Sequence, residues 1–137
     1  MSGFRKKLSG GDLRSIGKSN EVVQEVFDNP ELFAVVFQGT LSEDPLIRMR
    51  SADVIEKVST EHPEYLQPFK TRLINEVSKV EQKEVQWHVA QMFAYIEVTE
   101  EERNKIIEIL QQYAQSNESK LVVTFSLQTF SRFCPER

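Results

Sequence analysis

The residues best suited to chemistry are sparse in this sequence, and their spacing assembles no catalytic or metal site. Neither His62 nor His88 has a second His or Cys three or four positions away, the spacing that places two metal ligands on one helix face. The single cysteine, Cys134, is not followed by a helix start that would favour a thiolate. The acids Glu100 to Glu102 follow Thr99 in the pattern of a helix capping box, which accounts for them without catalysis. The sequence therefore predicts no enzymatic activity, no cofactor and no metal.

A set of cations, amides and aromatic rings is the remaining candidate for a functional site. These side chains recur in three segments, 47–58, 85–96 and 122–133, which share one apolar pattern. On a helical wheel of about 100° per residue they fall on a polar side of each segment. Arg and Tyr supply contact area and amides pair with exposed backbone, as protein interfaces require, although ordinary solvation of a helix face is the competing interpretation. We predict a partner-binding inner-helix face made of Arg50, Asp53, Lys57, His88, Gln91, Tyr95, Phe125, Gln128 and Arg132.

The three segments belong to a repeat that runs through most of the chain. Apolar residues recur every 37 or 38 positions in several columns: Leu32, Phe69, Ile106; Val36, Leu73, Leu110; Ile47, Val85, Val122; and Ala52, Ala90, Leu127. A helix pair in every 35 to 45 residues or so is the unit of an α-solenoid, in which stacked pairs bury a continuous core. We therefore predict an all-α protein, a right-handed α-solenoid of about three helix pairs with an N-terminal capping helix.

The predicted organisation is a single domain, residues 19–137, preceded by a flexible basic arm, residues 1–18. The domain consists of a capping helix (19–28) and three repeats (29–62, 63–98 and 99–134). Helix starts are predicted at Ser19-Asn20, at Asn29-Pro30, at Asp44-Pro45 and at the Thr99 capping box, and Gly39 is expected to end a helix. The run 121–125 would suit a strand by composition, but its register with the other two segments favours a helix.

Charge and hydropathy narrow the functional class. The formal net charge is −4; residues 1–18 carry five bases and one acid, or +4, so the remainder carries −8. An acidic body repels phosphate backbones, which argues against nucleic acid as a partner, although Arg50, Lys57 and Arg132 against Asp53 give the predicted face +2. No apolar run reaches the length of a membrane span, the N-terminus lacks a secretory signal, and a single cysteine suits a reducing compartment. We expect a cytoplasmic protein that contacts no membrane.

The segment from Asp44 to Ile55 resembles the second helix of HEAT-like, armadillo-type repeats. It has an acid and a proline in the turn, then the aliphatic–arginine pair Ile47-Arg48, then small residues before a large aliphatic one. The resemblance covers about residues 29–134. The arginine is replaced by Gln86 and Val123 in the following repeats, so the Arg ladder typical of the family is present once.

That resemblance implies a protein-binding scaffold or adaptor of the small bacterial type. Some HEAT-like proteins are instead alkylpurine DNA glycosylases, and a further group is similar to bilin lyases. Since fold does not fix function, these alternatives stay open. For a glycosylase-like site the candidates would be Asp53, Trp87 and Tyr95.

The last segment raises the question of what covers it. A solenoid needs terminal helices with polar outer faces, yet residues 122–133 include Phe125, Leu127, Phe130 and Phe133. Either another copy or a partner covers this segment, or a terminal cap lies outside this sequence. We expect the protein to bind a protein partner through the inner-helix face or the open C-terminal end, and to form a homodimer or larger species through its C-terminal repeat.

Overall fold

The computed structural model describes residues 16–116 and 118–133, with side chains from residue 19 onward. Every regular element in these residues is helical, which confirms the all-α prediction and the helix, rather than strand, over 121–125. Residues 1–15 of the predicted basic arm (1–18) lie outside the described residues, as do Cys134 and the three residues after it. The elements are α2 (Ile16–Asp28), α3 (Leu32–Gly39), α4 (Pro45–Glu61), α5 (Pro63–Leu66), η1 (Gln67–Phe69), α6 (Lys70–Asn75), η2 (Val77–Lys79), α7 (Lys83–Met92), η3 (Phe93–Tyr95), α8 (Glu100–Ser116) and α9 (Lys120–Phe133).

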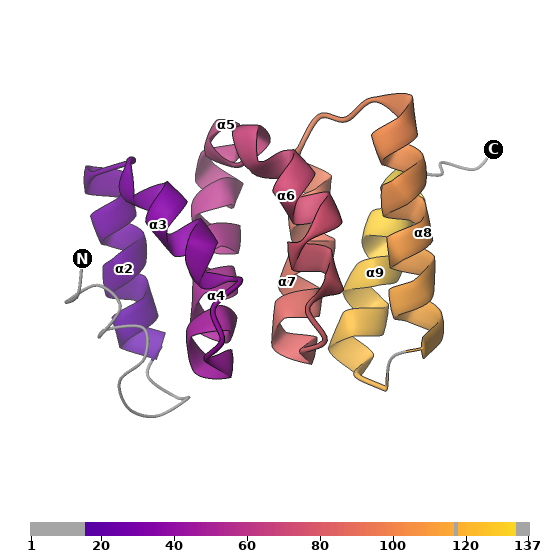
Figure 1. Cartoon of the computed structure of the whole chain (residues 1–137), viewed down its shortest axis with the longest axis horizontal. Helices are drawn as coiled ribbons and strands as arrows, with labels where there is room; N and C mark the ends of the chain where they lie inside the picture. The colour runs from indigo at the N-terminus through magenta and orange to yellow at the C-terminus, as the bar shows by residue number, and fades with distance from the viewer. Residues whose placement is uncertain (1–15, 117, 134–137) are drawn as a thin grey trace.

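The helices are arranged in two layers. One layer holds α2, α4, α7 and α9, each of which packs against the next. The other layer holds α3, the α5–α6 segment and α8, with α3 packed on α4, α6 in contact with α8, and α8 packed on α9. Figure 1 shows this order along the long axis of the molecule, from α2 at one end to α8 and α9 at the other. The segments that carry the predicted site therefore lie on neighbouring helices of the first layer.

The repeated apolar positions form the core between the layers. Three matched residues of the second layer are fully buried: Val36, Leu73 and Leu110. In another column the burial is not uniform, because Ala52 and Ala90 are fully buried whereas Leu127 is 54% exposed. The reason is positional: α4 and α7 each have a following helix packed against them, and α9 has none within the described part of the chain.

Two predicted helix starts are confirmed. Asp44 Oδ1 accepts a hydrogen bond from Leu46 N at 2.9 Å, and Pro45 occupies the first position of α4. At α8, Thr99 Oγ1 accepts from Glu102 N at 3.1 Å while Thr99 N donates to Glu102 Oε1 at 2.9 Å. This reciprocal pair satisfies two backbone donors and is the capping box that the sequence indicated.

Two other predicted starts are wrong. α3 begins at Leu32 without a side-chain cap, because Asn29 and Pro30 form a turn whose carbonyls accept from Leu32 N and Phe33 N, each at 3.0 Å. α2 begins at Ile16, and Ser19 lies buried inside that helix instead of capping it.

The segment 63–79 is broken into short pieces, α5, η1, α6 and η2. It begins at Pro63, but Pro68 falls inside it and cannot donate a backbone hydrogen bond, and its ring crowds the preceding turn. The chain therefore changes from α-helix to 3₁₀-helix around Pro68. This segment carries Gln67 and Lys70, which contact Glu97 and Glu102 at the start of α8.

Gly39 is the last residue of α3, and its small size allows a close approach between helices. A Cβ atom at this position would collide with Ser51 Oγ and lie 3.1 Å from Ser51 Cβ on α4. Any side chain at Gly39 therefore requires α3 or Ser51 to shift.

Candidate protein-interaction surfaces

Several predicted inner-face residues meet at the junctions between helices of the first layer. Asp53 Oδ1 on α4 lies 3.8 Å from His88 Nε2 on α7, and Asp53 Oδ2 lies 3.2 Å from Lys57 Nζ. Lys57 Nζ also donates to Asn20 Oδ1 on α2 at 3.3 Å. A chain of polar contacts therefore crosses α2, α4 and α7, and we call Asn20, Asp53, Lys57 and His88 the junction cluster.

Tyr95 makes a further link between the end of α7 and α4. Its hydroxyl donates to Glu56 Oε2 at 2.7 Å. Burial raises the pKa of the Glu56 carboxyl, and the bond from Tyr95 opposes that shift because it favours the carboxylate. Burial and the bond to Glu56 also raise the pKa of the Tyr95 hydroxyl, so this group stays a donor at physiological pH. Glu56 was not among the residues predicted from the sequence, although its position three residues after Asp53 places it on the same helix face.

His88 is held in its neutral form by its surroundings. Burial lowers the pKa of its imidazole to about 4, and the nearby Asp53 carboxylate opposes this only in part. Its Nδ1 is buried and has no hydrogen-bond partner among the described residues. At neutral pH the 3.8 Å contact with Asp53 is therefore a polar contact and not an ion pair, and His88 offers no charge to a partner.

The remaining predicted residues of α4, α7 and α9 differ in accessibility. Arg50 is only 3% exposed and lies in the interior. Gln91 Nε2 donates to the Trp87 carbonyl at 3.2 Å within α7, and Phe125 is partly buried against the core. The structure thus joins three of the nine predicted residues in the junction cluster and does not bring all nine to one open surface.

The accessible part of the inner-helix face is small and mixed in charge. The side chains of Lys57 and Asp53 are 38% and 27% exposed, and they pair with each other. Gln128 and Arg132 on α9 are exposed, and the positive charge of Arg132 acts on Tyr95. These groups suit polar contacts at the rim of an interface more than its centre.

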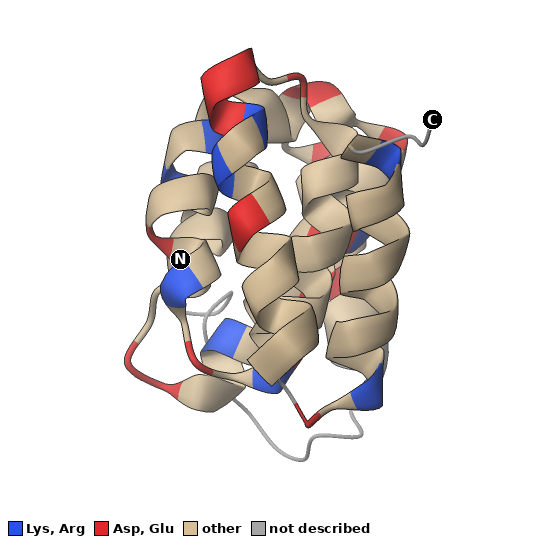
Figure 2. Cartoon of the chain, turned by 90° about the vertical axis from the view of Figure 1, so that its right-hand side faces the viewer, with Lys and Arg blue, Asp and Glu red and all other residues tan. Residues whose placement is uncertain are grey.

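The apolar part of the surface lies on α9. Leu121 and Leu127 are 46% and 54% exposed, and they are the large hydrophobic side chains exposed among the described residues. Thr124, Gln128 and Ser131 are exposed beside them, and we call these five residues the end face. Figure 2 looks onto this end of the molecule: the charges of α8 are confined to its upper half, and α9 carries a base only near each of its two ends.

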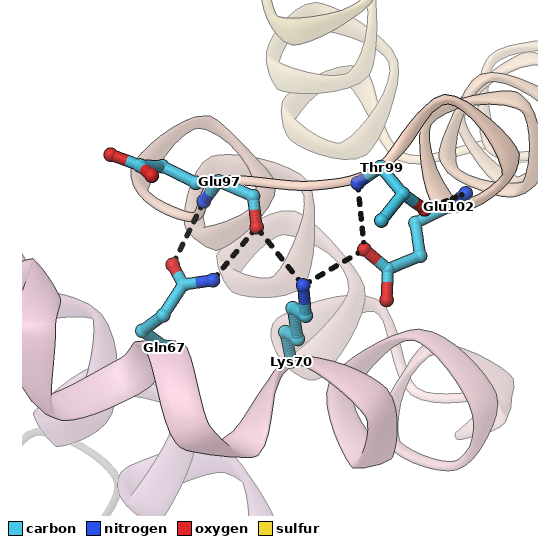
Figure 3. Close-up of polar contacts among 5 residues, drawn as sticks. All are labelled: Gln67, Lys70, Glu97, Thr99 and Glu102. Atoms are coloured by element: carbon cyan, nitrogen blue, oxygen red, sulfur yellow. Dashed lines mark hydrogen bonds and ion pairs between the residues drawn. The ribbon is translucent and has the colours of Figure 1, made fainter.

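A polar cluster holds α8 against the α5–α6 segment (Figure 3). Gln67 Nε2 donates to Glu97 O at 2.7 Å, and Gln67 Oε1 accepts from Glu97 N at 2.8 Å. Lys70 Nζ lies 3.0 Å from Glu102 Oε1, and the backbone bond from Thr99 together with Lys70 lowers the pKa of that carboxyl. All these groups find partners inside the protein, so we assign the cluster a structural role, which is to position α8 and, through it, α9.

Little in the described part suits small-molecule chemistry. An open cleft of about 730 Å³ lies between α6, the start of α7 and α8, and it is lined mainly by polar groups such as Lys79, Lys83 and Gln86. The Tyr113 hydroxyl at its edge is occupied by a 2.6 Å bond to the Ser78 carbonyl. Within residues 16–116 and 118–133, no three His, Cys, Asp or Glu side chains come together in a way that could hold a metal ion.

None of the helices described has both the length and the apolar character needed to cross a bilayer.

Comparison with known proteins adds no relative. No family model matches the chain, and searches of curated proteins and of solved structures return no match.

Proposed function

We propose that this chain is a non-enzymatic protein-interaction module, a HEAT-like scaffold or adaptor of the cytoplasm built as an α-solenoid. The layered helix pairs support the proposal, since residues 37 or 38 positions apart occupy matched places in the core. The groups with catalytic potential support it too, because Tyr95 bonds to Glu56 across a helix junction and Asp53 pairs with Lys57 within α4.

The observation that carries the proposal is the exposure of Leu121 and Leu127 on α9. Exposed leucines that lie singly need no explanation. These two lie about 120° apart at the edges of the uncovered side of α9, and they present apolar area where each preceding helix is covered by the next. The bases Lys120 and Arg132 and the amide of Gln128 supply a polar rim around them. We assign the end face as the main binding surface and the accessible inner-face residues as its extension.

Affinity capture followed by quantitative binding tests this function. The full chain is immobilised, a protein it retains is purified, and the dissociation constant of that protein is measured with four forms of the chain. These are the wild type, Leu121→Gln/Leu127→Gln, Lys57→Ala, and the control Ala34→Gln at an exposed position of α3.

We expect the double leucine variant to weaken binding by at least about tenfold, because central apolar contacts dominate interface energies. Lys57→Ala should have a smaller effect, and Ala34→Gln none. Equal affinity of all four forms would show that the end face is not the binding surface.

The nucleic-acid alternative receives no support from the described surface. Arg50 is buried, and the two bases of α9 stand at opposite ends of the helix. We expect no DNA binding even at low salt, where phosphate contacts are strongest. Binding that falls steeply with salt and is lost in Arg132→Ala would favour the alternative.

A further inference from the structure

We propose that the end face packs against α8 of a second copy of this chain, so that α8 and α9 of the two copies form an antiparallel four-helix bundle. The inference rests on the proposed function, since it names the occupant of the same surface. Three features of α8 and α9 lead to it: a matching stripe, a matching spacing and a complementary charge pattern.

The stripe that faces the second copy lies on the outer side of α8. Ile109 and Gln112 of this helix line the cleft towards α6. At about 100° per residue, the side away from that cleft carries Ile107, Gln111 and Ala114. Ile107 and Ala114 are partly exposed and Gln111 is exposed. This side of α8 is therefore partly apolar, uncharged at these three positions, and next to the end face.

The exposed apolar residues of α9 and α8 match in spacing along the helix axis, with Leu121 and Leu127 about 120° apart at the two edges of the end face. Leu121 and Leu127 are six residues apart, a rise of about 9 Å, and Ile107 and Ala114 are seven apart, a rise of about 10.5 Å. Within one chain α8 and α9 run in opposite directions (Figure 1), so a two-fold axis parallel to the helices sets α9 antiparallel to α8 of the second copy. Leu127 then lies against Ile107 of the second copy, and Leu121 against its Ala114.

The charges of the two helices agree with this pairing. The first nine residues of α8 hold four acids and two bases, and the last eight hold no charge. In the bundle Arg132 lies near the first turn of α8 of the second copy, where the three acids Glu100 to Glu102 outnumber the one base, Arg103. Lys120 approaches the end of the same helix, where the helix dipole is negative. Both bases of α9 therefore lie in a negative electrostatic potential of the second copy.

Other arrangements of two copies fit less well. Antiparallel pairing of α9 with α9 would set Lys120 opposite Arg132, which repel. Stacking of α9 on α2 of a second copy would bring Leu121 and Leu127 against the exposed acids Glu21 and Asp28, which would lose water without gaining an apolar contact. The α8–α9 pairing also closes as a two-fold dimer, whereas end-to-end stacking would continue into a filament.

Sedimentation velocity of the full chain over about 1 to 200 µM tests the interface, a range that brackets micromolar dimers. We expect wild type and Ala34→Gln to form dimers, and Leu121→Gln/Leu127→Gln to dissociate at least about tenfold more readily. Far-UV circular dichroism and urea unfolding verify that each variant folds. A wild type that stays monomeric throughout, or a folded leucine variant that dimerises like the wild type, would overturn the proposal.

A charge exchange between chains tests the pairing itself. Arg132→Glu and Glu100→Arg should each weaken the homodimer, since each sets like charges against each other at both symmetry-related contacts between α9 and the start of α8. An equimolar mixture of the two variants should recover the wild-type dimer, because the heterodimer has only opposite charges at these positions. A mixture that dimerises no better than its components would refute the pairing of α9 with α8. A monomeric chain whose end face binds another protein would end this inference and leave the proposed function standing.

Discussion

Tyr95 and Glu56 form a hydrogen bond that links two helical segments. The hydroxyl and the carboxylate lie 2.7 Å apart across the junction of α4 with the end of α7, and both are partly buried. Asp53 contacts His88 on α7, and Lys57 bonds to Asn20 on α2. At the scale of residues, the polar side chains on the inner face therefore serve largely to stabilise the packing of neighbouring helices.

Removal of the Tyr95 hydroxyl measures this contribution. Tyr95→Phe should lower the free energy of unfolding by about 1 to 2 kcal/mol, because Glu56 keeps its burial and loses its donor. Urea unfolding followed by circular dichroism gives the value. Tyr65→Phe is the matched control, since its ring stacks on His62 and its hydroxyl has no partner among the described residues. Equal stability of Tyr95→Phe and wild type would show that the link is not stabilising.

His88 gives the stability of the protein a pH dependence. Its folded pKa of about 4 lies below the ordinary value of 6.5, so between these pH values the unfolded chain binds a proton that the folded chain does not. The contribution of the neutral His88 side chain to the free energy of unfolding is fully present above pH 6.5. It is lost as the pH falls towards 4, by up to about 3 kcal/mol.

A comparison of wild type with His88→Gln separates the pH dependence due to His88 from that due to the carboxylates. Glu56, whose pKa is raised by burial, acts in the opposite direction, and Asp53, Lys57 and Glu84 also act on the ring. The unfolding free energy of wild type minus that of His88→Gln should therefore decline between pH 6.5 and 4. Parallel profiles for wild type and His88→Gln would contradict a buried neutral imidazole.

At the scale of elements, the contact of α3 with α4 depends on the absence of a side chain at Gly39. In an open helix, replacing Gly by Ala stabilises by roughly 1 kcal/mol. Here we expect Gly39→Ala to destabilise by about 1 to 3 kcal/mol, because its Cβ meets Ser51. Thermal or urea unfolding measures the change. Gly39→Ala/Ser51→Ala should recover part of the loss, since the hydroxyl that the new Cβ meets is gone, and a stabilising Gly39→Ala would refute the close contact.

Two of the four helix starts could be predicted from contiguous residues, while the burial and pairing of side chains that depend on distant contacts could not. Asp44 caps α4 and Thr99 pairs with Glu102, because a cap and its first turn are neighbours in the sequence. The burial of Arg50 depends on how α4 is rotated among the helices around it, which a wheel drawn for α4 alone does not contain. The pairing of Glu56 with Tyr95, 39 positions apart, likewise requires the packed layer.

The two ends of the molecule differ. α2 exposes Glu21, Gln24 and Asp28, whereas α9 exposes Leu121 and Leu127. The recurrence of apolar residues predicted the core correctly, but it also grouped Leu127 with Ala52 and Ala90, because a period cannot distinguish a helix followed by a neighbour from one without. At the scale of the whole molecule, this difference is the basis on which we propose the α8–α9 end as the side that receives another polypeptide.

Leucine methyl spectra test that claim most directly. The full chain, labelled at its leucine methyl groups, is observed by NMR as its concentration is raised and again as a protein captured by affinity is added. We predict that the signals of Leu121 and Leu127 shift or broaden in at least one of the two titrations, while those of the buried Leu66 and Leu73 stay in place. Binding in either titration that leaves Leu121 and Leu127 unchanged would contradict the assignment of the end face as the interaction surface.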